Sequence, residues 1–287
     1  AKALFALIKP ELTPTTDLIL APETYFTEGF GYSLPSLSSS FLYQSISEEL
    51  SRIEPIQLLT GIQLYQVYSE ADKTPTSNKM GNQWVDFYNS AFLSGTNSLQ
   101  VYHKSKLVVG TETLPYKQII EPLFGNIMLD LGGTVRSRAV DTDRKVFQLK
   151  NGSKVGPIIC YESVYGSFVG GYVRNGAEFL AVMTNDAWWG TTPGHRQLLS
   201  YTKLRAIETR LPIVRSANSG ISAIINSYGE VTKQIPYLKR DAMSVTIVPQ
   251  NQITFYVTYG DYIARLSLFV SVLLLLISIT RKKLIFR

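Results

Sequence analysis

The sequence is poor in the two residue types that carry most disulfide and zinc chemistry. It has one cysteine and two histidines in 287 residues. An intrachain disulfide is therefore impossible, and these residues do not form any zinc-type ligand spacing. The sequence also lacks a glycine-rich phosphate-binding loop of either standard form. These absences exclude a disulfide scaffold and predict that the chain uses no metal and no cofactor.

The excess of positive over negative charge is small outside the C-terminus. The net charge is +6, and four basic residues follow the last apolar run, at positions 281, 282, 283 and 287, so the rest of the chain carries +2. A basic patch interleaved with aromatic residues is lacking, which argues against nucleic acid as a partner. Hydrophobic residues make up 45% and charged residues 17%, as in a globular chain with an added membrane segment.

The segment 262–279 is almost wholly apolar and is followed by Arg281, Lys282 and Lys283. Its length lies near the lower end of the roughly 17 to 25 residues that span a bilayer. A buried core helix is the alternative, which the basic stop and the lack of a polar face disfavour. Arg265, near one end, can extend to the polar interface. The excess of basic residues predicts a cytoplasmic tail, with the rest of the chain across the membrane.

The single cysteine is a candidate nucleophile. Cys160 ends the apolar run 155–160 and is followed directly by Tyr161 and Glu162. A thiol at the end of a buried strand, beside polar groups, suits nucleophilic catalysis. The alternative is a small buried hydrophobic residue, which is what most free cysteines are.

Two further segments supply charged partners for the thiol. Glu23 follows the apolar run 18–21 and a proline, where a carboxylate is costly unless it is paired or used. Lys104 lies in a Tyr-His-Lys run, and Glu112 comes eight residues later. Taken alone, Glu23 is typical of a solvated loop residue and Lys104 of surface charge. The order Glu, Lys, Cys along the chain is what makes the three informative together.

Short β-branched and apolar runs alternate with helical periods along the chain. Strands are predicted at 18–21, 58–67, 87–93, 100–104, 155–160, 179–184, 213–217, 222–226 and 243–248, and helices at 1–9, 41–53, 164–175 and 195–209. Polar, turn-rich residues predict a surface loop at 69–81, and a stretch without a clean period predicts a long loop near the site at 115–133. This order predicts an α+β fold with a mixed sheet layered by helices.

These motifs resemble the nitrilase, or carbon–nitrogen hydrolase, superfamily, whose catalytic triad is Glu, Lys and Cys in that order. Within it, the chain is most similar to the catalytic domain of the bacterial apolipoprotein N-acyltransferase family. The resemblance rests on segments 22–24, 102–112, 160–162, 184–190, 204–210 and 215–222. It extends over nearly the whole chain.

The resemblance implies an αββα sandwich over residues 1–258, followed by a transmembrane helix and a basic cytoplasmic tail over 259–287. Nitrilase-like domains begin with a strand before their first helix, and the acyltransferase family carries N-terminal membrane helices. Neither is found here, so we expect the chain to begin inside its catalytic domain. The helix at 1–9 is then expected on an exposed flank, with little packed beneath one side.

Four residues take catalytic or supporting roles in this reading. Cys160 is the nucleophile, and Glu23 is the base that takes its proton and returns it to the leaving group. The Lys104 ammonium stabilises the oxyanion that develops on the acyl carbon. Glu112 resembles the second glutamate of the family, which holds Lys104 charged and oriented.

Five more residues are candidates for the surroundings of the site. The backbone N–H of Tyr161 is a candidate second oxyanion donor, and Glu162 has a supporting role by its place in the motif. Trp188 and Trp189 are candidate contacts for an acyl chain, with ordinary core packing as the alternative. Asn89 is either a hydrogen-bonding residue at a strand end or a substrate contact.

By resemblance, the chain is expected to transfer an acyl chain from a phospholipid, through a thioester on Cys160, to the N-terminal amine of a lipid-modified cysteine of an apolipoprotein. This places it in the bacterial inner membrane with its catalytic domain in the periplasm. One alternative is a carbon–nitrogen hydrolase acting on a small amide or nitrile, which has no need of the helix at 262–279. The other is an inactive, truncated domain.

Overall fold

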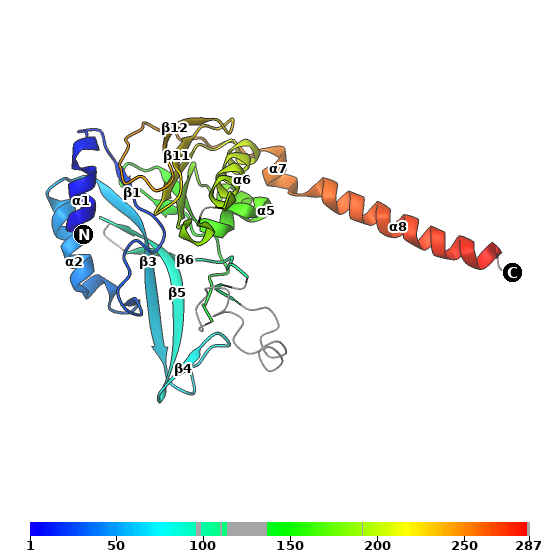
Figure 1. Cartoon of the computed structure of the whole chain (residues 1–287), viewed down its shortest axis with the longest axis horizontal. Coiled ribbons are helices and arrows are strands. Elements are labelled where there is room, and N and C mark those ends of the chain that lie inside the picture. Colours follow the sequence, from blue (N-terminus) through cyan, green and yellow to red (C-terminus); the bar gives the residue numbers. More distant parts are fainter. Residues whose placement is uncertain (96–98, 110, 114–136, 191, 286–287) are drawn as a thin grey trace.

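In the computed structural model of the chain, which describes residues 1–95, 99–109, 111–113, 137–190 and 192–285, two β-sheets lie side by side (Figure 1). The first sheet contains β1 (Leu18–Leu20), β2 (Tyr32–Ser33), β3 (Gln57–Tyr68), β4 (Asn78–Met80), β5 (Gln83–Ser94) and β6 (Gln100–His103). Its order is β1-β3-β5-β4, with β2 paired to β3 and β6 paired to β5. Among the described residues, β1 has β3 as its one strand neighbour.

The second sheet has the order β12-β11-β10-β9-β8-β7. Its strands are β7 (Phe147–Gln148), β8 (Lys154–Ile159), β9 (Phe179–Thr184), β10 (Ile213–Ala217), β11 (Ser222–Ile225) and β12 (Val231–Ile235). Strands β8, β9 and β10 are parallel, and the outer strands are antiparallel to their neighbours. The carboxyl ends of β8 and β9 therefore lie at the same edge of the sheet.

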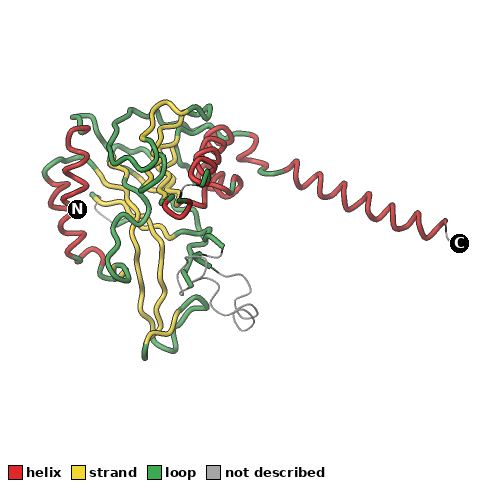
Figure 2. The backbone as a smooth tube through the Cα atoms, in the orientation of Figure 1, coloured by secondary structure: helices red, strands yellow, loops and turns green. Residues whose placement is uncertain are grey.

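Helices cover the outer side of each sheet (Figure 2). The α-helices are α1 (Lys2–Ile8), α2 (Phe41–Ser51), α5 (Gly166–Arg174), α6 (Gly194–Thr209), α7 (Phe255–Tyr259) and α8 (Tyr262–Ile285), and the short 3-10 helices are η1 (Lys9–Glu11), η2 (Leu37–Ser39), η3 (Cys160–Val164) and η4 (Ala187–Trp189). With α1 and α2 on the first sheet and α5 and α6 on the second, the order of layers is the predicted αββα sandwich.

The first half of strand β3, residues 57–62, is buried on both faces, and Leu58, Leu59 and Ile62 supply its apolar side chains. Successive side chains of a strand point to opposite faces. Leu58 and Ile62 pack with Ile46 of α2, whereas Leu59 lies in the core between the sheets with Val182 of β9. The candidate site residues come from this double-sided core and from the turns at its edge.

Helix α1 is formed as predicted, but its expected exposed flank is wrong. Leu4 and Phe5 are only 5% and 8% exposed and join the core that contains Ile19 and Leu58. Helix α2 begins as its sequence predicts, because the Ser40 hydroxyl accepts a hydrogen bond of 3.2 Å from the Tyr43 N–H.

Eight of the nine predicted strands have a counterpart, and the strand predicted at 243–248 is wrong. Residues 243–248 have no regular secondary structure and do not pair with a strand. Backbone groups of this segment bond to side chains instead: the Ser244 N–H donates to a Glu11 carboxylate oxygen at 3.0 Å, and the Ser244 carbonyl accepts a 3.4 Å hydrogen bond from Lys233 Nζ. The sequence prediction missed β12, because it is polar and mostly exposed, and the very short β2, β4 and β7. The loop predicted at 115–133 lies outside the described residues.

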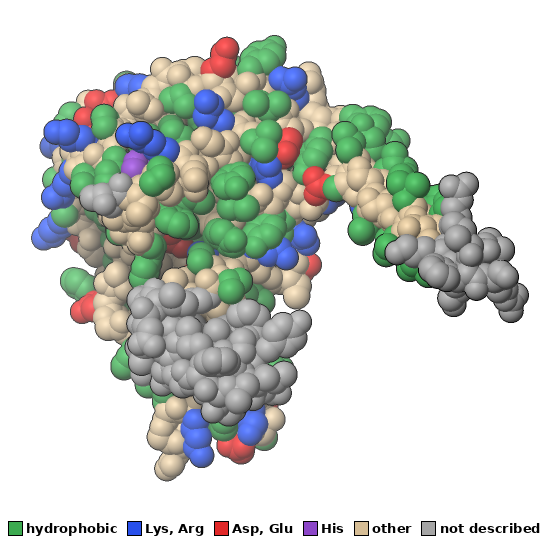
Figure 3. Space-filling view, turned by 45° about the vertical axis from the view of Figure 1, so that its right-hand side comes forward, with side chains coloured by type: hydrophobic (Ala, Val, Ile, Leu, Met, Phe, Trp, Pro, Cys, Tyr) green, Lys and Arg blue, Asp and Glu red, His purple; other side chains and the backbone are tan. Residues whose placement is uncertain are grey.

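Helix α8 projects from the sandwich, and its apolar side chains are open to the surroundings (Figure 3). Residues Tyr262–Thr280 have a mean hydropathy of 2.3, and the window is 0% buried. The alternative of a core helix covered by strands of the domain is therefore wrong. By length and composition α8 can cross a membrane.

Core packing beneath α2 can be tested with two phenylalanines. We expect Phe92→Ala to lower the free energy of unfolding by about 3–5 kcal/mol, since it leaves a cavity in a core. Phe92 is 0% exposed, whereas Phe41, at the start of α2, is 86% exposed. Phe41→Ala is the matched control and is expected to change stability by about 0.5 kcal/mol or less. Urea denaturation in detergent measures both, and equal losses would contradict this packing.

Candidate active site

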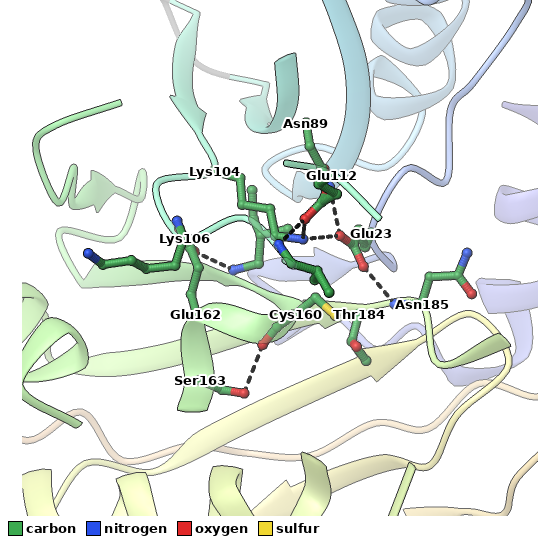
Figure 4. Close-up of polar contacts among 12 residues, drawn as sticks. Glu23, Asn89, Lys104, Lys106, Glu112, Cys160, Glu162, Ser163, Thr184 and Asn185 are labelled. Carbon is green, nitrogen blue, oxygen red and sulfur yellow. Dashed lines mark hydrogen bonds and ion pairs between the residues drawn. The ribbon is translucent and has the colours of Figure 1, made fainter. Parts of the chain in front are cut away.

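Cys160 sits in a sharp turn between β8 and η3. Its φ is +50°, in the left-handed region that costs energy for a residue with a side chain. The Ser163 hydroxyl donates a 2.8 Å hydrogen bond to the Cys160 carbonyl, which holds this turn. The strand thus ends abruptly and turns the buried thiol toward the other sheet (Figure 4).

Glu23 lies in a second strained turn, after β1. Thr24 beside it has φ +44°. A Cβ on Gly61 of β3 would lie 2.5 Å from the Glu23 Cα and 2.4 Å from the Thr24 nitrogen. Only glycine at position 61 therefore lets the turn approach β3 this closely. Glu23 itself is buried, although a loop carboxylate is usually solvated.

Lys104, directly after β6, is buried between two carboxylates. Its Nζ lies 3.0 Å from Glu23 Oε1 and 2.8 Å from Glu112 Oε2, and the residue is 1% exposed. Burial alone would lower the pKa of the lysine, but the two carboxylates outweigh it and raise that pKa. Lys104 attracts Glu112 in turn and, despite burial, lowers the pKa of the Glu112 carboxyl. Lys104 is therefore held as the ammonium.

Asn89 of β5 joins the two carboxylates from the opposite side. Its Nδ2 donates hydrogen bonds of 2.7 Å to Glu23 Oε1 and 3.0 Å to Glu112 Oε1. Its backbone carbonyl accepts a 2.8 Å hydrogen bond from the Lys104 N–H. Asn89 lies inside β5 and not at a strand end, so that part of the prediction is wrong, and its side chain makes its hydrogen bonds within the charged cluster.

The Cys160 sulfur faces this cluster. Figure 4 shows the thiol beside Lys104, Glu23 and Thr184. Burial and the Glu23 charge raise the pKa of the thiol to about 12, against the opposing attraction of Lys104. The resting sulfur is therefore protonated, so it needs a base before it can attack a carbonyl.

Glu162 is fully buried under the turn, where it links the Lys104 segment to the Cys160 turn. Its Oε1 accepts hydrogen bonds from the Tyr102 hydroxyl and, at 2.6 Å, from the Ser105 N–H. Its Oε2 accepts a 2.7 Å bond from the Ile159 N–H. Burial raises the pKa of this carboxyl to about 7. Glu162 thus fixes the distance between the lysine and the thiol and does not face the cluster itself.

The remaining predicted residues lie around these turns. Tyr161 is in the first turn of η3, where backbone N–H groups have no intrahelical acceptor. Trp188 is 63% exposed, and Trp189 is 39% exposed and packs closely over Gly194 at the start of α6. Neither tryptophan is a core residue.

The sequence reasoning assigned Trp188 and Trp189 after β9, but it gave no individual role to Thr184 or Asn185, which lie closer to the thiol and to Glu23. The Asn185 N–H donates a 2.8 Å hydrogen bond to Glu23 Oε2, and Thr184 borders the thiol. The signal was available: β8 and β9 are adjacent parallel strands, so the residues that end them share one edge of the sheet. Among the described residues, no group of three or more His, Cys, Asp or Glu side chains could hold a metal ion.

Comparison with known proteins assigns the family. The model of the carbon–nitrogen hydrolase family matches residues 9–254. The chain belongs to the carbon–nitrogen hydrolase family. The solved carbon–nitrogen hydrolase from Helicobacter pylori G27 has a TM-score of 0.55 at 14% identity, over 83% of this chain and 79% of that one. Saccharomyces cerevisiae Nit3, of the nitrilase superfamily, has the same TM-score, identity and coverage. These two structures support the fold.

Curated relatives of this carbon–nitrogen hydrolase carry a more specific name. An apolipoprotein N-acyltransferase from Chlorobaculum tepidum is 30% identical over 202 residues, 68% of this chain and 38% of its own length. One from Pseudomonas syringae pv. tomato is 29% identical over 247 residues, 86% of this chain and 44% of its own. One from Bdellovibrio bacteriovorus is 30% identical over 87% of this chain and 44% of its own. The chain thus spans less than half the length of these relatives.

The Asn89 amide bridges two carboxylates, so a substitution that changes this one group is expected to lower the stability of the protein strongly. Asn89→Asp replaces a donor between two carboxylates by a third carboxylate. We expect a loss of about 3–5 kcal/mol in the free energy of unfolding at pH 7, as for a buried charge without a partner. Chemical denaturation followed by circular dichroism measures it.

Asn151→Asp is the matched control for this substitution. Asn151 is exposed and its Oδ1 accepts a 3.0 Å hydrogen bond from the Ser153 N–H, which an aspartate also accepts. Its effect is expected to be about 0.5 kcal/mol or less. Similar losses in both variants would mean that Asn89 does not connect the two carboxylates.

Proposed function

We propose that this chain is an N-acyltransferase that forms a thioester on Cys160 from a phospholipid acyl group. The observation that carries the chemistry is the buried Lys104, paired with Glu23 and Glu112 beside the chain's one thiol. The choice of a lipid donor is supported by the exposed, apolar α8 and by the names of the relatives. The proposed acceptor is the N-terminal amine of a lipid-modified cysteine on an apolipoprotein.

The first half-reaction begins with a proton transfer. Glu23 takes the proton of Cys160, and the thiolate attacks the ester carbonyl of the phospholipid. The transfer stays within one cluster, so the total charge around Lys104 does not change. The tetrahedral intermediate then expels the lysophospholipid alkoxide, which receives the proton from Glu23. The products are the thioester and a lysophospholipid.

The second half-reaction reverses these roles. The acceptor amine attacks the thioester carbonyl and passes a proton to Glu23 as the amide bond forms. The carbon–sulfur bond breaks, and the Cys160 thiolate takes the proton back from Glu23. In both halves the Lys104 ammonium and the Tyr161 N–H are the proposed donors to the oxyanion. Lys104 stays charged throughout, because Glu112 remains ionised beside it and, whenever Glu23 holds the proton, the negative charge lies on the sulfur or on the oxyanion instead.

The base of α8 suits a membrane interface. Phe255, Tyr259 and Tyr262 are exposed, and their rings contact one another, with centroids 4.5 Å apart for the first pair and 5.3 Å for Phe255 and Tyr262. Aromatic residues are enriched where a transmembrane helix enters the headgroup region. We propose that α8 crosses the bacterial inner membrane, with the basic tail in the cytoplasm and the sandwich in the periplasm.

Trp188 and Trp189, both exposed beside the site, are proposed contacts for the acyl chain.

The proposed function predicts a covalent adduct at one position. After incubation with phosphatidylethanolamine vesicles, mass spectrometry is expected to find one acyl group on Cys160, removable by hydroxylamine. Cys160→Ser removes the thiol and should give no hydroxylamine-sensitive adduct. Lys106→Gln is the matched control for Lys104→Gln, since only Lys104 is paired with both carboxylates. We expect Lys104→Gln to slow adduct formation about 100-fold or more. Lys106→Gln should form the adduct at nearly the wild-type rate.

The fate of the adduct separates the proposal from its rival. Transfer to a diacylglyceryl-cysteine peptide, faster than hydrolysis, supports the acyltransferase. Hydrolysis alone, together with turnover of small amides, would identify an amidase. A folded chain without any adduct would be an inactive domain.

Membrane insertion can be tested with two charges on α8. Leu273 and Leu276 lie in the middle of the apolar segment. Each arginine placed at the centre of a transmembrane helix costs about 2.5–3.5 kcal/mol. Leu273→Arg/Leu276→Arg should therefore release the chain from membranes under alkaline carbonate extraction, whereas Leu273→Ala/Leu276→Ala should leave it bound. Retention of both variants to the same extent would contradict a membrane-spanning α8.

A further inference from the structure

A second buried ion pair lies behind the thiol and has no part in the steps above. Arg215 Nη2 lies 2.7 Å from Asp186 Oδ2, and both side chains are 0% exposed. Each guanidinium nitrogen has an acceptor: besides the ion pair at Nη2, Nε donates to the Ile221 carbonyl at 3.1 Å and Nη1 to the Thr202 hydroxyl at 3.3 Å. A buried ion pair is weak evidence of a gain in stability over apolar packing. The presence of a buried ion pair at this position therefore needs an explanation other than stability.

The pair reaches the sulfur through Thr184. The Thr184 hydroxyl lies within hydrogen-bonding reach of the Cys160 sulfur, where a hydrogen bond from it would lower the pKa of the thiol, but it also donates a 2.7 Å hydrogen bond to Asp186 Oδ1 (Figure 4). A hydroxyl has one hydrogen, and an ionised carboxylate can only accept. While Asp186 takes that hydrogen, Thr184 presents only lone pairs to the thiol. A hydroxyl that donated to the sulfur would instead stabilise the thiolate.

The backbone allows Asp186 little freedom to turn. A Cβ on Gly220 would lie 1.9 Å from Asp186 Oδ2, so the carboxylate packs directly against this glycine. Arg215 of β10 holds the same oxygen, and β10 pairs with β9 in parallel register, with Ala217 opposite Thr184. Two neighbouring segments thus fix the carboxylate that orients the Thr184 hydrogen.

We propose that Asp186 and Arg215 are a positioning pair that turns the Thr184 hydrogen away from Cys160, so that the thiol keeps its proton until Glu23 removes it. The inference rests on the proposed roles of Cys160 and Glu23. It gives the pair a chemical purpose: the sulfur is not released as a free thiolate in the absence of substrate.

Charged groups from several elements surround this thiol. Glu23 approaches from the turn after β1, Lys104 from the end of β6 and Asp186 from the end of β9. Glu112 lies behind Lys104, and Arg215 lies behind Asp186. Glu162 is held under the turn by backbone N–H groups. Asp186→Asn keeps the shape of the side chain but leaves the buried Arg215 without its charged partner, so a cooperative thermal melt is needed to show that the variant is folded.

The test is the rate at which iodoacetamide alkylates Cys160, measured against pH on the full chain by mass spectrometry. The single cysteine makes the readout specific. Asp186→Asn removes a negative charge and supplies an amide donor, which frees the Thr184 hydrogen to turn to the sulfur. We expect alkylation at pH 8 to become at least tenfold faster, equal to a fall of about one unit in the pKa of the thiol. An unchanged rate in a variant that melts cooperatively would overturn the proposal.

Thr184→Val provides a second test that does not depend on Asp186. The proposal holds that the hydroxyl only accepts from the thiol, so its removal should leave alkylation at least as fast as in the wild type. Thr184→Ser keeps the hydroxyl and should preserve the wild-type rate. Alkylation more than threefold slower in Thr184→Val would show that the hydroxyl donates to the thiolate, and would overturn the proposal.

The double variant asks whether the two residues act together. In the Thr184→Val background, Asp186→Asn should accelerate alkylation less than threefold, because the hydroxyl through which Asp186 acts on the sulfur is already absent. An undiminished tenfold effect would mean that Asp186 acts on the thiol by charge or packing alone, and would overturn the proposal that it acts through Thr184. Alkylation needs no lipid, so these results stand apart from any failure of acyl transfer.

Discussion

The structure of the site depends on one constraint, the burial of the Lys104 ammonium. An ammonium taken out of water is costly unless partners surround it. Its partners come from separate parts of the chain: Glu23 from the turn after β1, and Glu112 from beyond β6. Asn89 of β5 then separates and bridges the two carboxylates. The first sheet therefore cannot rearrange locally without exposing or orphaning a charge.

The second sheet supplies the thiol, and the layered architecture brings the two halves together. Parallel strands β8 and β9 end at one edge, which places Cys160 beside Thr184 and Asn185. The Asn185 N–H then holds Glu23 from the second sheet. Gly61 makes the approach of the Glu23 turn possible. In this arrangement the fold positions a base, an ammonium and a protonated thiol at one place, which is what the proposed thioester chemistry requires.

Much of this architecture could be predicted from the sequence, because strand alternation and buried apolar runs are local signals. The strands that carry Glu23, Lys104 and Cys160, and the apolar helix α8, follow from such runs. The segment 243–248 misled the prediction, since its alternation is that of a strand but the Ser244 backbone bonds to the side chains of Glu11 and Lys233 instead. Strand β12 was missed for the opposite reason: its residues are polar, and pairing with β11 defines it.

The contacts within the site were less predictable than its members. The order of Glu23, Lys104 and Cys160 suggested one group, yet the bridging place of Asn89 depends on the register of β5 with β6, which no local pattern encodes. The Asp186–Arg215 pair was missed because Asp186 follows β9, Arg215 lies on the neighbouring strand β10, and the two are far apart in sequence.

An experimental structure of the acylated protein tests the central claim most directly. If Lys104 stabilises the oxyanion, the carbonyl oxygen of the acyl group on Cys160 should lie within about 3 Å of Lys104 Nζ and point toward the Tyr161 N–H, with both carboxylates still on the lysine. A carbonyl turned away from Lys104, or a lysine that has left Glu23 and Glu112, would contradict the account.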